Sequence, residues 1–154
     1  MARKSFNEKL HDSKDMPKIV EVTEPKAVMR YGGTKMLIAP PMAYDNIMRK
    51  VPKGRLITSD YIREYLAKSY DADYTCQLTA GIFINIAAHA SSERGIDETP
   101  YWRTLKKDGE LNEKYPAGIE GHKMHLEKEG HTVMQKGKRF FVKDYQEKLF
   151  KLGD

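Results

Sequence analysis

A tyrosine and a tryptophan stand side by side between a proline and an arginine in the stretch ETPYWRTLKKDGEL. These four residues are Pro100, Tyr101, Trp102 and Arg103. A phenol has a pKa of about 10, so roughly one tyrosine in a thousand is ionised at neutral pH, and Tyr101 is a poor nucleophile. The indole of Trp102 offers only an N–H donor and cannot act as a base. The two rings favour binding over catalysis: they can stack on an aromatic ligand or plug a cavity, and the sequence leaves both open.

Cys76 is the single cysteine, and it stands near the start of a predicted helix, where the helix dipole would lower its pKa. No histidine lies close to it in the sequence to act as a base. A small apolar side chain of this kind usually packs in the interior. We therefore expect Cys76 to be structural rather than a nucleophile.

His122, His125 and Glu129 fall on one face of another predicted helix, and His131 follows just beyond it. Imidazole and carboxylate groups bind metals, but this spacing is not one of the strong zinc signatures, and lysines flank these residues. We expect a polar face exposed to solvent. The sequence thus predicts no metal, and nothing in it implies a cofactor.

The composition is that of a globular protein, with 40% hydrophobic and 32% charged residues among 154. The net charge of +5 permits nucleic-acid binding without requiring it. Lysine and arginine are absent from residues 74–93 and frequent from residue 103 to residue 151. The longest apolar run, residues 78–90, is too short to span a bilayer, and the N-terminus lacks the apolar centre of a signal peptide. With one cysteine, these features predict a cytoplasmic protein that does not associate with membranes.

The elements that must position these residues follow from apolar periodicity and from capping residues. Residues 1–17 are polar and predict a loose arm, and residues 91–98 predict a polar loop. The expected elements are strands at 18–22 and 36–39, helices at 43–50, 59–69 and 75–89, a small hairpin at 105–111, a helix at 120–129, a hairpin turning at 136–137, and a short helix from Asp144 to Leu152. The helix at 75–89, capped by Thr75, is apolar nearly all round and should be buried. It follows the helix at 59–69 after a short turn, which is compatible with a helix-turn-helix.

Four pieces of the chain occur in an order that resembles a known family: VPKGRLITSDYI, LTAGIFI, TPYWRTLKKDGELNEKYPAGIE and LEKEGH. They are similar to the C-terminal domain of the O6-alkylguanine-DNA alkyltransferases and of their non-catalytic relatives, the alkyltransferase-like proteins. The resemblance covers residues 45–131. It implies an α+β, winged-helix-like domain with a helix-turn-helix, which we place at residues 45–154, after an N-terminal extension of residues 1–44. The C-terminal hairpin and short helix lie outside the resemblance.

The family's reactive motif is Pro-Cys-His-Arg, in which the cysteine keeps the alkyl group and a glutamate orients the histidine. By the resemblance, Pro100 and Arg103 match this motif, whereas Tyr101 stands at the cysteine and Trp102 at the histidine. Glu129 matches the glutamate. The resemblance therefore implies a protein that is not an enzyme at this motif. The residues that it places at the base pocket are Pro100, Tyr101, Trp102, Arg103, Tyr115 and Gly118.

The family inserts the second helix of its helix-turn-helix into the minor groove and flips the modified base into a pocket. By position, Ser59 replaces a tyrosine that helps to rotate the nucleotide, and Leu78 replaces an intercalating arginine. The helix carries no cation, and the spacing of Leu78 with Ile82 favours a core residue over a wedge between bases. Positive charge can come instead from the QKGKR turn, as a DNA-binding wing or as a solvated hairpin. The residues expected at DNA on this basis are Ser59, Thr75, Gln77, Leu78, Lys136, Lys138 and Arg139.

Three functions are consistent with these residues. The leading hypothesis is a non-catalytic protein that binds double-stranded DNA containing O6-alkylguanine or another altered base and marks it for other repair proteins. The alternative is a domain that has lost DNA binding and binds a small molecule or a protein. Alkyl transfer to Cys76 is a third hypothesis, which lacks a neighbouring base to form the thiolate.

Overall fold

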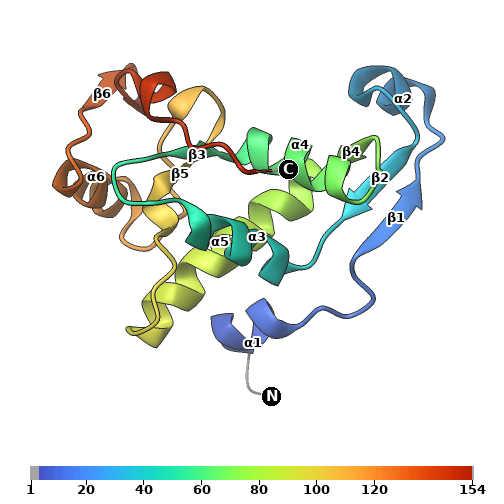
Figure 1. Cartoon of the computed structure of the whole chain (residues 1–154), viewed down its shortest axis with the longest axis horizontal. Helices are drawn as coiled ribbons and strands as arrows, with labels where there is room; N and C mark the ends of the chain where they lie inside the picture. Colours follow the sequence, from blue (N-terminus) through green and yellow to red (C-terminus); the bar gives the residue numbers. More distant parts are fainter. Residues whose placement is uncertain (1–3, 154) are drawn as a thin grey trace.

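The computed structural model describes residues 4–153 and combines helices with short strands, which confirms the expected α+β class. The longest helix, α5 (Gln77–Arg94), crosses the middle of the molecule (Figure 1). Three helices contact it: α1 (Phe6–His11), α3 (Pro41–Lys50) and α4 (Ser59–Ser69). The main hydrophobic core forms where these helices meet. Its largest fully buried side chains are Leu10, Leu37, Tyr44, Met48 and Ile62.

A three-stranded sheet joins the N-terminal residues to the helices. Strand β1 (Lys18–Glu21) pairs antiparallel with β2 (Lys35–Ile38), with Lys18 opposite Ile38. Strand β2 in turn pairs in parallel with β4 (Tyr74–Thr75), which directly precedes α5. Helix α2 (Pro25–Tyr31) connects β1 to β2, and the Glu24 carboxylate caps it. The strands expected at 18–22 and 36–39 are confirmed, with ends shifted by one residue.

The loose arm expected at the N-terminus is wrong for residues 6–11, which form α1. Ser5 and Glu8 form a capping box at its first turn. The Asn7 amide donates hydrogen bonds to the Ala90 carbonyl and to the Glu93 carboxylate of α5, and Leu10 enters the core. The sequence Ser-x-x-Glu before an apolar residue was the sequence signal for this helix. Residues 1–3 of the expected arm lie outside the described part of the chain.

The C-terminal half contains two small sheets and a second core. Strand β3 (Ile57–Thr58) pairs in parallel with β5 (Thr104–Leu105), and β6 (Val133–Lys136) forms a hairpin with β7 (Arg139–Val142). Helix α6 (Gly118–Lys128) packs beside them. The residues of the second core are Leu56, Leu105, Leu111, Leu126 and Val142. The expected hairpin at 136–137 and the expected helix before Gly130 are confirmed.

The chain differs from expectation at 105–111 and near residue 144. It turns at Asp108 and Gly109, both with positive φ, within the short 3-10 helix η2 (Lys107–Gly109), but β5 pairs with β3 and no hairpin forms. A second 3-10 helix, η3 (Tyr145–Lys148), replaces the expected helix, and the side chain of Asp144 does not cap it. Both differences arise because partners distant in sequence take the backbone hydrogen bonds.

Helix α5 also runs further than expected, to Arg94 rather than His89. The buried Ser91 hydroxyl accepts the Thr99 amide hydrogen and donates to the Thr99 carbonyl, so the start of the expected polar loop is packed, whereas residues 95–98 form an exposed loop as expected. Cys76, not Thr75, occupies the N-cap position of α5. Among the described residues, no helix combines the length and apolar character that a membrane crossing needs.

Replacing Leu10 with alanine tests whether α1 is part of the core. The side chain is 1% exposed, so Leu10→Ala should lower the free energy of unfolding by about 2–5 kcal/mol, as core truncations do. Urea denaturation measures this change. The matched control is Met29→Ala, because Met29 is 87% exposed and its truncation should cost less than about 0.5 kcal/mol. Equally small losses in both variants would mean that α1 does not dock in solution.

Candidate nucleic-acid interface

The rings of Tyr101 and Trp102 are packed inside the molecule, in the 3-10 helix η1 (Tyr101–Arg103). They are 6% and 9% exposed. The Trp102 ring stacks on His125 of α6, with centroids 4.3 Å apart. Tyr101 meets Trp102 and Tyr115 edge-on, at 5.3 and 5.1 Å. We call Tyr101, Trp102, Tyr115 and His125 the aromatic plug, since their rings pack against one another and three of them are residues that the family resemblance assigns to the base pocket.

His122 packs against Tyr115 of the plug and is fully buried. The Asn112 amide donates to its Nδ1 at 3.1 Å, and Nε2 lies 2.8 Å from the Trp102 carbonyl oxygen. Because a carbonyl only accepts, Nε2 carries the proton and the imidazole is neutral. Burial lowers the pKa of His122 to about 4, against a hydrogen bond to Trp102 that raises it. Both nitrogens are occupied and cannot bind a metal.

Arg103 and Glu129 form a nearly buried ion pair that links η1 to the end of α6. The guanidinium donates Nη2–H to Glu129 Oε2 at 2.7 Å and Nε–H to Oε1 at 2.9 Å, and its Nη1 donates to the Val51 carbonyl. Burial alone would raise the pKa of the Glu129 carboxyl, but hydrogen bonding to Arg103 holds it below its ordinary value. The glutamate that matches the family's histidine-orienting residue therefore holds an arginine here.

These contacts correct the expected solvent-exposed face of His122, His125 and Glu129. His122 is buried, His125 stacks on Trp102, and Glu129 binds Arg103. A helical wheel cannot reveal this, because the neighbours that cover the face come from η1. Within residues 4–153, histidine, cysteine and acidic residues form no group suited to hold a metal ion.

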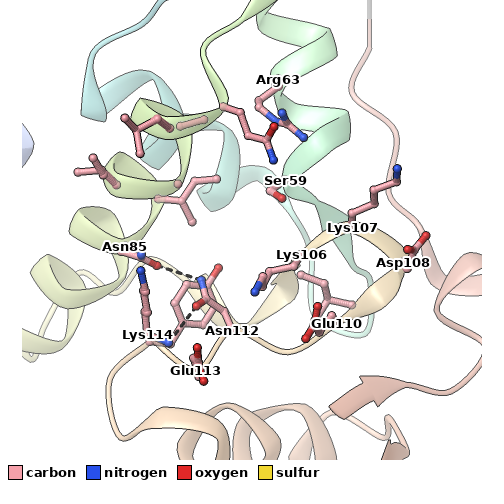
Figure 2. Close-up of a pocket in the computed structure, with 18 of the residues that line it drawn as sticks. Ser59, Arg63, Asn85, Lys106, Lys107, Asp108, Glu110, Asn112, Glu113 and Lys114 are labelled. Atoms are coloured by element: carbon pink, nitrogen blue, oxygen red, sulfur yellow. Dashed lines mark hydrogen bonds between the residues drawn. The ribbon is translucent and has the colours of Figure 1, made fainter. Parts of the chain in front are cut away.

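A cleft with a volume of about 450 Å³ lies between α5 and the segment from Leu105 to Tyr115. This volume is within the range of about 300–1,000 Å³ that is usual for small-ligand sites. Figure 2 shows Ser59 and Arg63 on one side and Asn112, Glu113 and Lys114 on another. The residues of the sequence-based prediction that line it are Ser59, Gln77, Leu78, Tyr115 and Arg139.

One face of α5 forms a wall of this cleft and is open to solvent. Leu78 is 74% exposed and Ile82 is 47% exposed. The expectation that Leu78 is a core residue is therefore wrong, because α1 and α3 pack on α5 elsewhere and leave this face uncovered. Gly81 lies between the two on the same face, and a Cβ added there would meet no atom within 4 Å. Packing within the chain does not require a glycine at this position, which leaves room for a partner to approach the backbone closely.

The positively charged side chains that line the cleft come from elements other than α5. Arg63 comes from α4, and Lys106, Lys107 and Lys114 come from the segment opposite α5. Sequence reasoning missed all four. The pair of lysines in LKKDGEL was the available signal, but nothing in the sequence showed that this turn faces the cation-free helix.

The remaining predicted residues lie in other environments. Thr75 is buried and its hydroxyl donates to the Arg63 carbonyl at 2.7 Å, so the expectation that it meets DNA is corrected. Arg139 pairs with Glu110 at 2.8 Å at the edge of the cleft. Lys136 and Lys138 are exposed on the β6–β7 hairpin and do not line the cleft.

Two residues of the predicted base pocket mark the ends of the plug. Pro100 precedes η1, and Gly118 begins α6 with a positive φ of 64°. The plug, not an open pocket, lies between them. Of the predicted pocket residues, Tyr115 alone lines the open cleft beside the plug.

The fold is the one that the resemblance implied, that of the alkyltransferase-like proteins. Two solved structures share the fold, one of Schizosaccharomyces pombe Atl1 in complex with damaged DNA containing O6-carboxymethylguanine and one of S. pombe ATL in complex with DNA. Each superimposes with a TM-score of 0.54 at 18% identity, over 73% of this chain and 94% of that one. No protein-family model and no curated protein matches the sequence. At this identity the likeness establishes the fold and nothing further about this chain.

The protonation of His122 can be measured directly. Its pKa of about 4 lies below the value of 6.5 for a free imidazole, so the unfolded chain takes up the proton first as the pH falls. This contribution to stability is complete above about pH 6.5 and is lost toward pH 4, by roughly 3 kcal/mol. An NMR titration of the folded protein should show the His122 imidazole neutral at pH 5. A midpoint near 6.5 would contradict the buried, hydrogen-bonded geometry.

Proposed function

We propose that this protein binds double-stranded DNA without catalysing alkyl transfer, that it prefers duplexes with an O6-alkylated guanine, and that it thereby marks them for other repair proteins. The observation that carries the proposal is the cleft, in which an exposed apolar helix face lies opposite a segment that carries three lysines interspersed with three acidic residues: Lys106, Lys107, Asp108, Glu110, Glu113 and Lys114. The shared fold with S. pombe Atl1, whose structure was solved with damaged DNA, supports the proposal.

The exposed face of α5 is suited to the minor groove in shape. Leu78 and Ile82 expose apolar side chains to solvent near the start of α5. Such an exposed apolar patch is unfavourable unless a partner covers it. Leucine and isoleucine are among the side chains that minor-groove proteins insert between base steps to kink the duplex. Leu78 stands at the position where the family resemblance places an intercalating arginine, and an apolar wedge replaces a cationic one.

The cations around the cleft supply the phosphate contacts that this wedge cannot. Lys106 and Lys107 are exposed, and the structure gives neither a salt bridge to another described residue. By contrast, Arg139 is paired with Glu110. Unpaired lysines bind phosphate by releasing counterions, so they contribute affinity that depends on salt. Placing these lysines opposite α5 lets one duplex contact both.

Alkyl transfer has no nucleophile at this motif. Tyr101 is buried, and burial together with Glu98 raises the pKa of its phenol above the ordinary value. Its oxygen is therefore even less ionised than a free tyrosine at neutral pH. Trp102 offers no basic atom. A protein of this kind acts by binding the altered duplex and not by repairing it.

The first test is binding of the purified protein to two labelled duplexes that differ in one O6-methylguanine, at low and moderate salt. We expect tighter binding to the modified duplex and a steep loss of affinity with salt. Two double variants remove equal charge: Lys106→Ala/Lys107→Ala should lower the salt slope by roughly two, and Lys136→Ala/Lys138→Ala by less. The reverse order would move the phosphate contacts to the hairpin. No binding to either duplex would refute the proposal and favour a scaffold that has lost DNA binding.

Truncating the wedge tests the role of the α5 face. Burying a leucine side chain contributes about 1.5–3 kcal/mol, so Leu78→Ala should weaken duplex binding by roughly 10–100-fold. Fluorescence anisotropy measures the change. Ile96→Ala is the matched control, since Ile96 is also exposed, at 75%, but lies outside the cleft. Similar affinities for both variants would exclude insertion of Leu78.

A further inference from the structure

Asn85 is the one amide that α5 presents at the inner end of the cleft. It lies four residues after Gly81 and eight after Gln77, so the three residues share a helical face. Figure 2 shows Asn85 pointing to Asn112 on the opposite segment, with Lys114 beside it. A base that entered the cleft along α5 would therefore meet Asn85 last.

The orientation of the Asn85 amide follows from its neighbours. The Lys114 backbone N–H donates to Asn112 Oδ1 at 2.9 Å, and a backbone N–H can only donate. Asn112 therefore presents its Nδ2 to Asn85, whose Oδ1 accepts at 2.9 Å. The Asn112 backbone N–H is held in turn by His122. Asn85 Nδ2 is left with two N–H donors that bond no described protein atom, at the surface of the cleft.

The aromatic plug prevents a base from going deeper. Tyr115 lines the cleft with one part of its surface and packs edge-on against Tyr101 behind it. Its hydroxyl donates to the Thr104 carbonyl, which holds the ring in place. A base in the cleft is therefore bounded by Tyr115 and is recognised at the level of Asn85, not at Tyr101.

We propose that Asn85 is the residue that distinguishes an O6-alkylated guanine from guanine, by donating an Nδ2–H hydrogen bond to N1 of the extruded base; this rests on the proposed function. Guanine carries a hydrogen on N1, which would face the amide N–H of Asn85 and leave that donor unsatisfied. Alkylation at O6 removes that hydrogen and turns N1 into an acceptor beside O6. An unpaired buried donor is penalised more than a good hydrogen bond is rewarded, so the site rejects guanine. Lysines at the rim contact phosphate and do not contribute to this preference.

The test is the ratio of affinities for the modified and unmodified duplexes. Asn85→Asp keeps an oxygen that accepts from Asn112 and removes both N–H donors, so the segment stays in place and the preference, roughly tenfold for one donor left unsatisfied, should fall to one or invert. The added negative charge weakens both duplexes alike and cancels in the ratio. Asn85→Leu removes the donors without adding charge and should also bring the ratio to one. Asn46→Leu, at an exposed asparagine of α3, is the control that keeps the preference.

The three possible outcomes test different parts of the two proposals. If both Asn85 variants keep the wild-type ratio, Asn85 does not read the base, although DNA binding stands. If the wild-type protein binds both duplexes equally, duplex binding stands and the selective role of Asn85 is overturned. If the wild-type protein binds neither duplex, the proposed function fails and the role of Asn85 fails with it.

Discussion

The packing of α5 is the constraint on which the rest of the structure depends. Ala80, Ala87, Ala88 and Ala90 are each at most 1% exposed, and such small side chains let neighbouring helices approach closely. Helices α1 and α3 occupy that side, so the stability of α5 comes from one part of its circumference. The part that carries Leu78, Gly81 and Ile82 is left for the cleft. One helix thus forms part of the core on one side and a wall of the cleft on the other.

The Arg103–Glu129 ion pair holds the segment Pro100–Arg103 in place, although this segment carries no nucleophile. Its burial is costly in desolvation, and the pair persists because two hydrogen bonds join the guanidinium to the carboxylate and a third reaches the Val51 carbonyl. The pair fixes the end of α6 against η1, and thereby sets where His125 meets Trp102.

Much of the fold could be predicted from the sequence because the helices follow simple periodicity and the hairpin turns at a glycine, Gly137, followed by Lys138. The errors lie where distant segments decide the outcome. Leu78 carries the spacing of a core residue, and only the absence of a covering helix exposes it. His122 looks polar on a helical wheel, and only the carbonyl of Trp102 and the amide of Asn112 make its burial possible. For the same reason the sequence named Ser59, Gln77 and Tyr115 for the site but not the lysines that face them.

Under the proposed function, the packed aromatic plug and the open cleft both suit a protein that recognises a base without reacting with it. A transferase must bring the alkyl carbon to its nucleophile, and this requires a deep pocket that weakens the core around it. A protein that only distinguishes two bases needs a difference in binding free energy, and one donor at the surface can supply it. The rings of Tyr101, Trp102, Tyr115 and His125 stabilise the interior through stacked and edge-on aromatic contacts. The wall that α5 provides stays open beside them.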